Sequence, residues 1–123
     1  MKTVKILVVD DQAIIAEDLI MKVAEMGYSG VAVSSGKEAL QQITLNFKPD
    51  LILMDVTLKD GESGIQAARD IQEYDQIPIL FVTARSASVV LGQIGGLVHT
   101  GYIQKPFCKN DLQLGIRKLL ATA

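Results

Sequence analysis

The chain has 123 residues, of which 49% are hydrophobic, so one domain with a substantial apolar core is expected over residues 1–123. Lys and Arg number 12 and Asp and Glu number 14, a net charge of −2 that argues against a clustered basic surface for direct nucleic-acid binding. The apolar runs are too short for membrane insertion, and one cysteine cannot form an internal disulfide, so a reducing, cytoplasmic setting is expected.

Five apolar runs alternate with five segments of helical period. The apolar runs predict strands over residues 4–9, 30–33, 51–54, 77–82 and 101–104. Helices are predicted over residues 12–26, from Ser35 to the Lys48-Pro49 pair, from near Glu62, over 86–97 and from Asn110 onward. Because single-helix crossovers between parallel strands are right-handed and cover both sheet faces, this alternation predicts an α/β fold with an open, doubly wound parallel sheet.

Local signals refine three of these elements. Ser35 with Glu38 three positions later is a capping box, and Asn110 is a suitable N-cap for the last helix, whereas Phe47 is placed inside the second helix. The segment 86–97 contains three glycines, each costing about 0.5–1 kcal/mol relative to alanine in a helix, so a short or mobile helix is expected there. A turn is predicted at Lys59-Asp60-Gly61.

Chemically useful side chains follow four of the five predicted strands. Asp10 and Asp11 follow the first strand, Asp55 follows the third, Thr83 the fourth and Lys105 the fifth. Ligands of open parallel sheets bind outside the carboxyl ends of the strands, so these groups are expected at one rim. Taken singly, each also has an ordinary interpretation, since Asp11 and Thr83 could cap helices, Lys105 could be a solvated surface lysine and Asp55 could belong to a turn.

Convergence of the three carboxylates has an electrostatic cost if the first and third strands are neighbours. Two unit negative charges about 4 Å apart repel by about 4 kcal/mol at an effective dielectric constant near 20, so the cluster needs a counter-ion or a raised pKa. Lys105 can supply one positive charge, and an all-oxygen site of this kind suits Mg²⁺. His99 and Cys108 offer no zinc-type ligand set.

The same rim argues against dinucleotide and flavin binding. Those folds need a glycine- or hydroxyl-rich loop after the first strand, where backbone N–H groups meet phosphate. This chain has Asp10-Asp11-Gln12 at that place, and it contains neither a G-x-G-x-x-G nor a Walker A sequence.

Four motifs together resemble the receiver domain of two-component response regulators, and the resemblance covers the whole chain. The motifs are Val8-Val9-Asp10-Asp11, Leu53-Met54-Asp55, Val82-Thr83-Ala84 and Tyr102-Ile103-Gln104-Lys105-Pro106-Phe107. The resemblance implies a flavodoxin-like (βα)5 fold with strand order 2-1-3-4-5. It also implies that Asp55 accepts a phosphoryl group from a histidine of a sensor kinase or of a histidine phosphotransfer protein.

The resemblance further implies the roles of the neighbouring residues. Asp10 or Asp11, with Asp55 and the backbone carbonyl of Thr57, would hold Mg²⁺. Lys105 and Thr83 would contact phosphoryl oxygens, and the Lys105-Pro106 peptide bond would be cis. Ala84 is small enough to leave the site open to a partner's phosphohistidine.

A switch and an output surface complete the implied function. Tyr102 would turn inward behind Thr83 on phosphorylation, and the alternative is that Tyr102 is an ordinary half-buried aromatic of an edge strand. A downstream protein would bind the surface formed by the fourth helix, the fifth strand and the last helix. That surface departs from the common family pattern, because Val98-His99 occupies positions where small residues are usual.

Two alternatives to the phosphorylated switch stay open. One is a Mg²⁺-dependent phosphatase or phosphotransferase with Asp10 or Asp55 as nucleophile, which would need a substrate pocket or cap segment that 123 residues do not provide. The other is a phosphate-independent interaction module with a receiver fold. The receiver itself could be a stand-alone protein, a part of a longer regulator or the receiver of a hybrid kinase.

Overall fold

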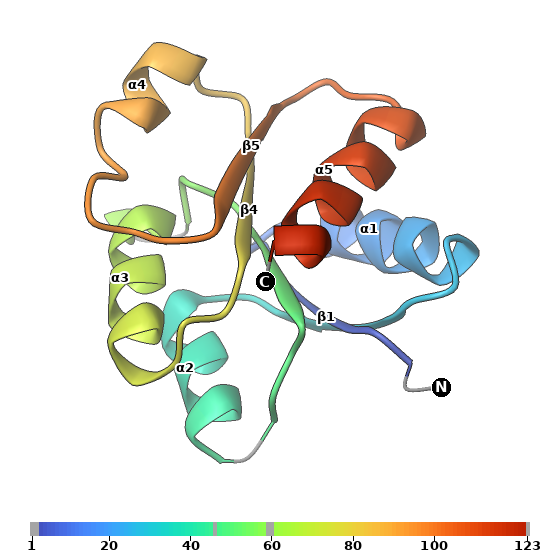
Figure 1. Cartoon of the computed structure of the whole chain (residues 1–123), viewed down its shortest axis with the longest axis horizontal. Helices are drawn as coiled ribbons and strands as arrows, with labels where there is room; N and C mark the ends of the chain where they lie inside the picture. Colours follow the sequence, from blue (N-terminus) through green and yellow to red (C-terminus); the bar gives the residue numbers. More distant parts are fainter. Residues whose placement is uncertain (1–2, 46, 59–60, 123) are drawn as a thin grey trace.

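A five-stranded parallel sheet forms the centre of the molecule (Figure 1). The computed structural model describes residues 3–45, 47–58 and 61–122. The strands are β1 (Lys5–Val9), β2 (Ser29–Val33), β3 (Leu51–Met54), β4 (Ile79–Thr83) and β5 (Thr100–Gln104). The helices are α1 (Ala13–Glu25), α2 (Gly36–Thr44), α3 (Gly64–Tyr74), α4 (Ala87–Leu91) and α5 (Lys109–Thr122). The strand order β2-β1-β3-β4-β5 confirms the predicted fold class.

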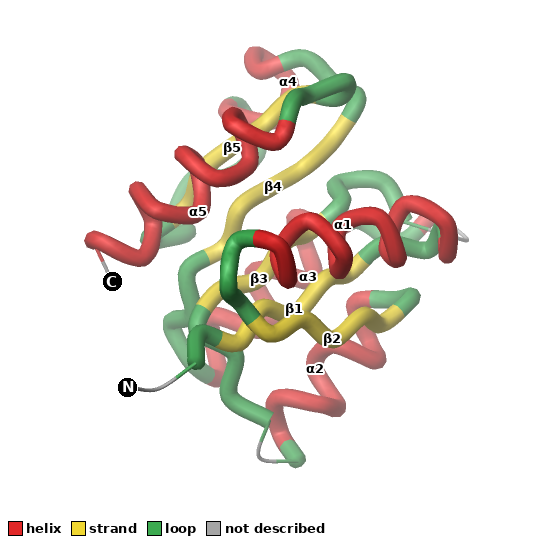
Figure 2. The backbone as a smooth tube through the Cα atoms, turned by 90° about the vertical axis from the view of Figure 1, so that its right-hand side faces the viewer, coloured by secondary structure: helices red, strands yellow, loops and turns green. Residues whose placement is uncertain are grey.

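Helices cover both faces of the sheet. α1 and α5 pack on one face, and α2, α3 and α4 pack on the other (Figure 2). Successive residues of a strand point to opposite faces, so Ile6 and Val8 of β1 join the α1/α5 core whereas Leu7 and Val9 join the α2/α3 core. This two-sided burial explains why β1 is a continuous apolar run instead of an alternating one.

The start of α5 and the end of α2 differ from the sequence prediction. α5 begins at Lys109, so Asn110 lies in its first turn and the predicted N-cap is wrong. Instead, the Asp111 carboxylate accepts the Cys108 N–H at 3.4 Å. α2 ends at Thr44, and Phe47 lies beyond it with a partly buried ring against the core. The backbone leaves the helical region at Leu45, the C-cap, well before Lys48, the residue that Pro49 keeps out of the α region.

The segment after α4 is held by side chains of α3. α4 ends at Leu91 and does not continue to residue 97, so the predicted range 86–97 is wrong, whereas the short helix expected from the glycines in this region is confirmed. The Arg69 guanidinium donates to the Gly95 carbonyl at 2.7 Å, and the Gln72 side-chain amide pairs with both the N–H (3.0 Å) and the carbonyl (2.7 Å) of Val98. His99 then adopts a φ of 51°, a left-handed conformation in which glycine carries no steric cost. The backbone conformation therefore explains why a residue without a side chain suits this position.

The turn predicted at residues 59–61 lies mostly outside the described residues, which resume at Gly61. In the part of the chain that the structure describes, the helices are too short or too polar to cross a membrane.

Gly64 allows the closest backbone approach near the carboxyl edge of the sheet. A Cβ atom at this position would lie 1.8 Å from the Asp55 carbonyl oxygen. Gly64→Ala is therefore expected to lower the free energy of unfolding by about 1–3 kcal/mol, because backbone must shift to admit the methyl group. Urea denaturation measures this loss.

Gly95→Ala is the matched control, since a Cβ at Gly95 meets nothing within 4 Å. A loss at Gly64 no greater than that at Gly95 would contradict the close approach.

Candidate functional site

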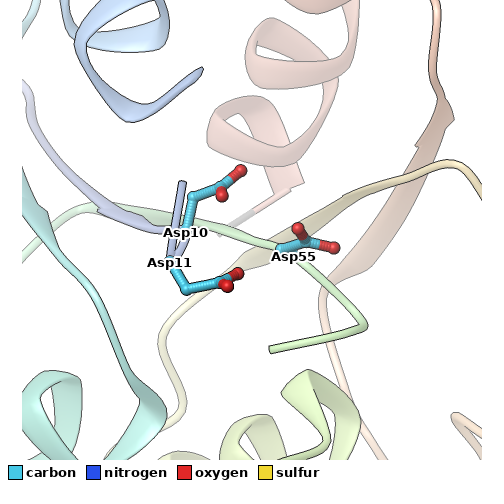
Figure 3. Close-up of side chains that lie close together, drawn as sticks. All are labelled: Asp10, Asp11 and Asp55. Carbon is cyan, nitrogen blue, oxygen red and sulfur yellow. The ribbon is translucent and has the colours of Figure 1, made fainter. Parts of the chain in front are cut away.

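Three carboxylates meet at the carboxyl edge of the sheet (Figure 3). Asp10 and Asp11 follow β1, and Asp55 follows β3. The pairing of β1 with β3 aligns Val9 with Met54, which places the residues after them side by side. Carboxylate oxygens of the three aspartates lie within 4.8 Å of one another. The predicted convergence is therefore present in the structure.

Lys105 brings a positive charge to this cluster from β5. Its Nζ lies 3.5 Å from Asp10 Oδ2 and 3.6 Å from Asp55 Oδ2. Its backbone N–H donates to the Thr83 carbonyl at 2.8 Å, and the Lys105-Pro106 peptide bond is cis, as the resemblance implied. Lys105 thus contacts two of the three aspartates across the end of β4.

Burial makes the charge of Asp55 costly. Desolvation raises the pKa of Asp55 above its ordinary value, and the nearby Asp10 and Asp11 carboxylates raise it further. The Lys105 ammonium and a hydrogen bond from the Thr57 N–H to Asp55 Oδ1, at 3.2 Å, act in the opposite direction. One lysine beside three carboxylates leaves an excess of negative charge, so the cluster can accept a divalent cation.

The donor set fits Mg²⁺. Asp10 is only 3% exposed, whereas Asp11 and Asp55 are partly exposed, so a ligand from solvent can reach the cluster. All candidate ligand atoms are hard oxygens, which Mg²⁺ prefers. Among the described residues, neither His99 nor Cys108 belongs to a group of side chains that could hold a metal ion.

Thr83 and Tyr102 are linked through Arg85, a residue that the sequence analysis did not single out. Thr83 is buried, and its Oγ1 accepts the Arg85 N–H at 3.2 Å. The Arg85 Nε donates to Thr57 Oγ1 at 3.0 Å, and the Tyr102 hydroxyl donates to the Arg85 carbonyl. The sequence contained one signal for Arg85, which is a positively charged residue two positions after Thr83, at the end of a strand that reaches the acidic rim.

Comparisons with known proteins agree with this geometry. The model of the response regulator receiver domain matches residues 6–117. An uncharacterized transcriptional regulatory protein, YrkP of Bacillus subtilis, is 36% identical over 88% of this chain and 46% of its own length. The DNA-binding response regulator MtrA of Mycobacterium tuberculosis is 35% identical over 94% of this chain and 50% of its own length. The chain therefore spans about half the length of these relatives.

Solved structures give the same assignment. A response regulator receiver protein from Sinorhizobium medicae superposes with a TM-score of 0.87 at 27% identity, covering 98% of this chain and 96% of the other. The N-terminal domain of a response regulator/sensory box/GGDEF protein from Carboxydothermus hydrogenoformans gives a TM-score of 0.88 at 29% identity, covering 96% and 94%. Because the family model matches residues 6–117, this chain belongs to the response regulator receiver domain family of two-component systems.

Proposed function

We propose that Asp55 accepts a phosphoryl group from a phosphohistidine of a sensor kinase or of a histidine phosphotransfer protein. The observation that carries the proposal is the partly exposed Asp55 carboxylate beside Asp10 and Asp11, with the Lys105 ammonium 3.6 Å away. In the transfer, an Asp55 carboxylate oxygen forms the new O–P bond while the P–N bond of the phosphohistidine breaks. The electron pair of the broken bond stays on the imidazole nitrogen.

We assign the cation site to the Asp10, Asp11 and Asp55 carboxylates together with the backbone carbonyl of Thr57. Mg²⁺ held by these residues would neutralise charge on the transferring phosphoryl group. Lys105, already placed between Asp10 and Asp55, would pair with a phosphoryl oxygen.

Thr83 and Tyr102 are the proposed switch. A phosphoryl group adds about −1.5 to −2 charge and three acceptor oxygens, so it can accept a hydrogen bond from the Thr83 O–H and draw this side chain toward it. That hydroxyl now accepts the Arg85 N–H, and the Arg85 carbonyl now holds the Tyr102 hydroxyl. Movement of Thr83 toward the phosphoryl group would therefore release Tyr102 to turn inward and alter the α4–β5–α5 surface.

Residues 1–123 are proposed as one receiver unit that acts by binding other proteins. A downstream protein would dock on α4, β5 and α5, and with a net charge of −2 this chain would not contact nucleic acid directly. The relative from Mycobacterium tuberculosis is named as DNA-binding, but this chain spans half of its length.

Intact mass spectrometry with acetyl phosphate and Mg²⁺ tests the acceptor. The wild-type chain is expected to gain one labile phosphoryl group, and Asp55→Asn is expected to gain none, because the amide removes the nucleophilic carboxylate. Asp70→Asn, an exposed aspartate of α3, serves as the control and is expected to react like the wild type.

Failure of the folded wild-type chain to react with acetyl phosphate and with a phosphorylated histidine donor would contradict the proposal. That result would favour the phosphate-independent interaction module.

The raised pKa of Asp55 predicts a pH-dependent stability difference. A carboxyl group whose pKa is higher in the folded than in the unfolded chain destabilises the fold as pH rises through the folded pKa. Asp55→Asn is therefore expected to raise Tm at pH 7, and the gain should disappear below the ordinary carboxyl pKa of 3.8. Thermal melts of wild type and variant across pH measure this, and a pH-independent difference would contradict it.

Loss of the Thr83 hydroxyl is expected to leave the reaction at Asp55 intact but to abolish the conformational response of α4 and β5. In Thr83→Val, Asp55 should still bind the phosphoryl analogue beryllofluoride, but the exchange protection of α4 and β5 should no longer change. Hydrogen exchange with and without the analogue measures this, with Thr44→Val in α2 as the control. An undiminished response in Thr83→Val would show that the switch does not pass through this hydroxyl.

A further inference from the structure

The Glu62 side chain extends from the loop after Asp55 to the start of α2. Its Oε1 accepts the Gly36 N–H at 2.8 Å, across 26 positions of sequence. Gly36 is the first residue of α2, and the first N–H groups of a helix have no partner within the helix. The Glu62 carboxylate therefore supplies an acceptor that α2 itself lacks, at the end of the helix dipole that favours negative charge.

The start of α2 is a fixed anchor for this side chain. Ser35 Oγ accepts the Glu38 N–H at 3.1 Å, so a second N–H group of this turn already has its own cap. A Cβ atom at Gly36 would lie 2.5 Å from the Ala67 Cβ, which shows how closely α2 approaches α3, its neighbour on the same sheet face (Figure 1). The Gly36 N–H thus has little freedom to follow a displaced carboxylate.

The backbone of Glu62 is tied to the residues directly after Asp55. The Leu58 N–H donates to the Glu62 carbonyl at 3.0 Å, and the Gly64 N–H donates to the Val56 carbonyl at 2.7 Å. Thr57, between Val56 and Leu58, pairs with Ser63 in an antiparallel bridge. Through these contacts the Glu62 side chain links α2 to the backbone that carries Thr57.

We propose that Glu62 is a positioning residue, which braces Thr57 against the start of α2 so that the Thr57 carbonyl is held in place for the divalent cation. The inference rests on the proposed function, because it takes Thr57 as part of the cation site. Partners that orient metal ligands typically change metal affinity by about 10- to 100-fold when they are lost. Sequence analysis used Glu62 only as the start of a helix, since a contact across 26 positions leaves no local pattern.

Two substitutions of Glu62 separate the effect of its hydrogen bond to Gly36 from the effect of its negative charge. Glu62→Ala removes the acceptor and the charge, whereas Glu62→Gln removes the charge but keeps a carbonyl oxygen that can accept the Gly36 N–H. Glu73→Ala is the control, because Glu73 is an exposed carboxylate on α3 and its loss changes the net charge equally.

Electron paramagnetic resonance of Mn²⁺ titrated into each protein measures cation affinity without any phosphodonor. Glu62→Ala is expected to weaken Mn²⁺ binding about tenfold, whereas Glu62→Gln and Glu73→Ala stay within about twofold of the wild type. Equal weakening in Glu62→Ala and Glu62→Gln would assign the effect to charge and overturn the brace. Unchanged affinity in Glu62→Ala would overturn it as well.

Hydrogen exchange of the metal-free proteins distinguishes failure of the brace from failure of the proposed function. The Gly36, Leu58 and Gly64 amides are expected to exchange faster in Glu62→Ala and at the wild-type rate in Glu62→Gln. If the wild-type chain binds no Mn²⁺, the cation site of the proposed function is wrong, and the claim about Thr57 falls with it. Unchanged exchange in Glu62→Ala beside normal Mn²⁺ binding by the wild type would overturn the brace alone.

Discussion

The common direction of all five strands is the constraint on which the site depends. Because β1, β3, β4 and β5 are parallel, the residues after them reach the same edge of the sheet, although they come from positions 10 to 105 of the chain. The order β2-β1-β3-β4-β5 then makes β1 and β3 neighbours, which puts Asp10 beside Asp55. An edge with three carboxylates carries a repulsive cost, which the Lys105 ammonium after β5 reduces.

The sequence predicted those parts of the molecule that depend on short-range patterns. Apolar runs located the five strands. The polar residues that follow four of them located the acidic edge, because the carboxyl ends of parallel strands lie at the same edge of the sheet. Strand order came from the family resemblance, since hydrophobic period does not specify which strands are neighbours. α5 begins two residues earlier than an N-cap at Asn110 predicts, because the Cys108–Asp111 contact lies at the start of the helix and Asn110 falls in its first turn.

Contacts between distant segments were not predictable from local sequence. Arg85 joins Thr57 to the end of β4, and Glu62 joins the Asp55 loop to α2, and each is a single side chain with no periodic signal. Arg85 contacts the Thr57 hydroxyl directly, whereas Glu62 is connected to the Thr57 backbone only through its neighbours, by the Leu58 N–H bond to the Glu62 carbonyl. If Glu62 braces Thr57 as we propose, the position of Thr57 depends on two other parts of the fold, and the proposed cation site depends on more than the three aspartates.

A crystal structure of the chain with Mg²⁺ and beryllofluoride is the most direct test of the assignment of this edge as a phosphoryl site. The account predicts beryllium bonded to an Asp55 carboxylate oxygen, Mg²⁺ on the aspartate carboxylates and the Thr57 carbonyl, and the Lys105 ammonium on a fluoride. An Asp55 carboxylate without the beryllium adduct, or Mg²⁺ bound away from Asp10, Asp11 and Asp55, would contradict it.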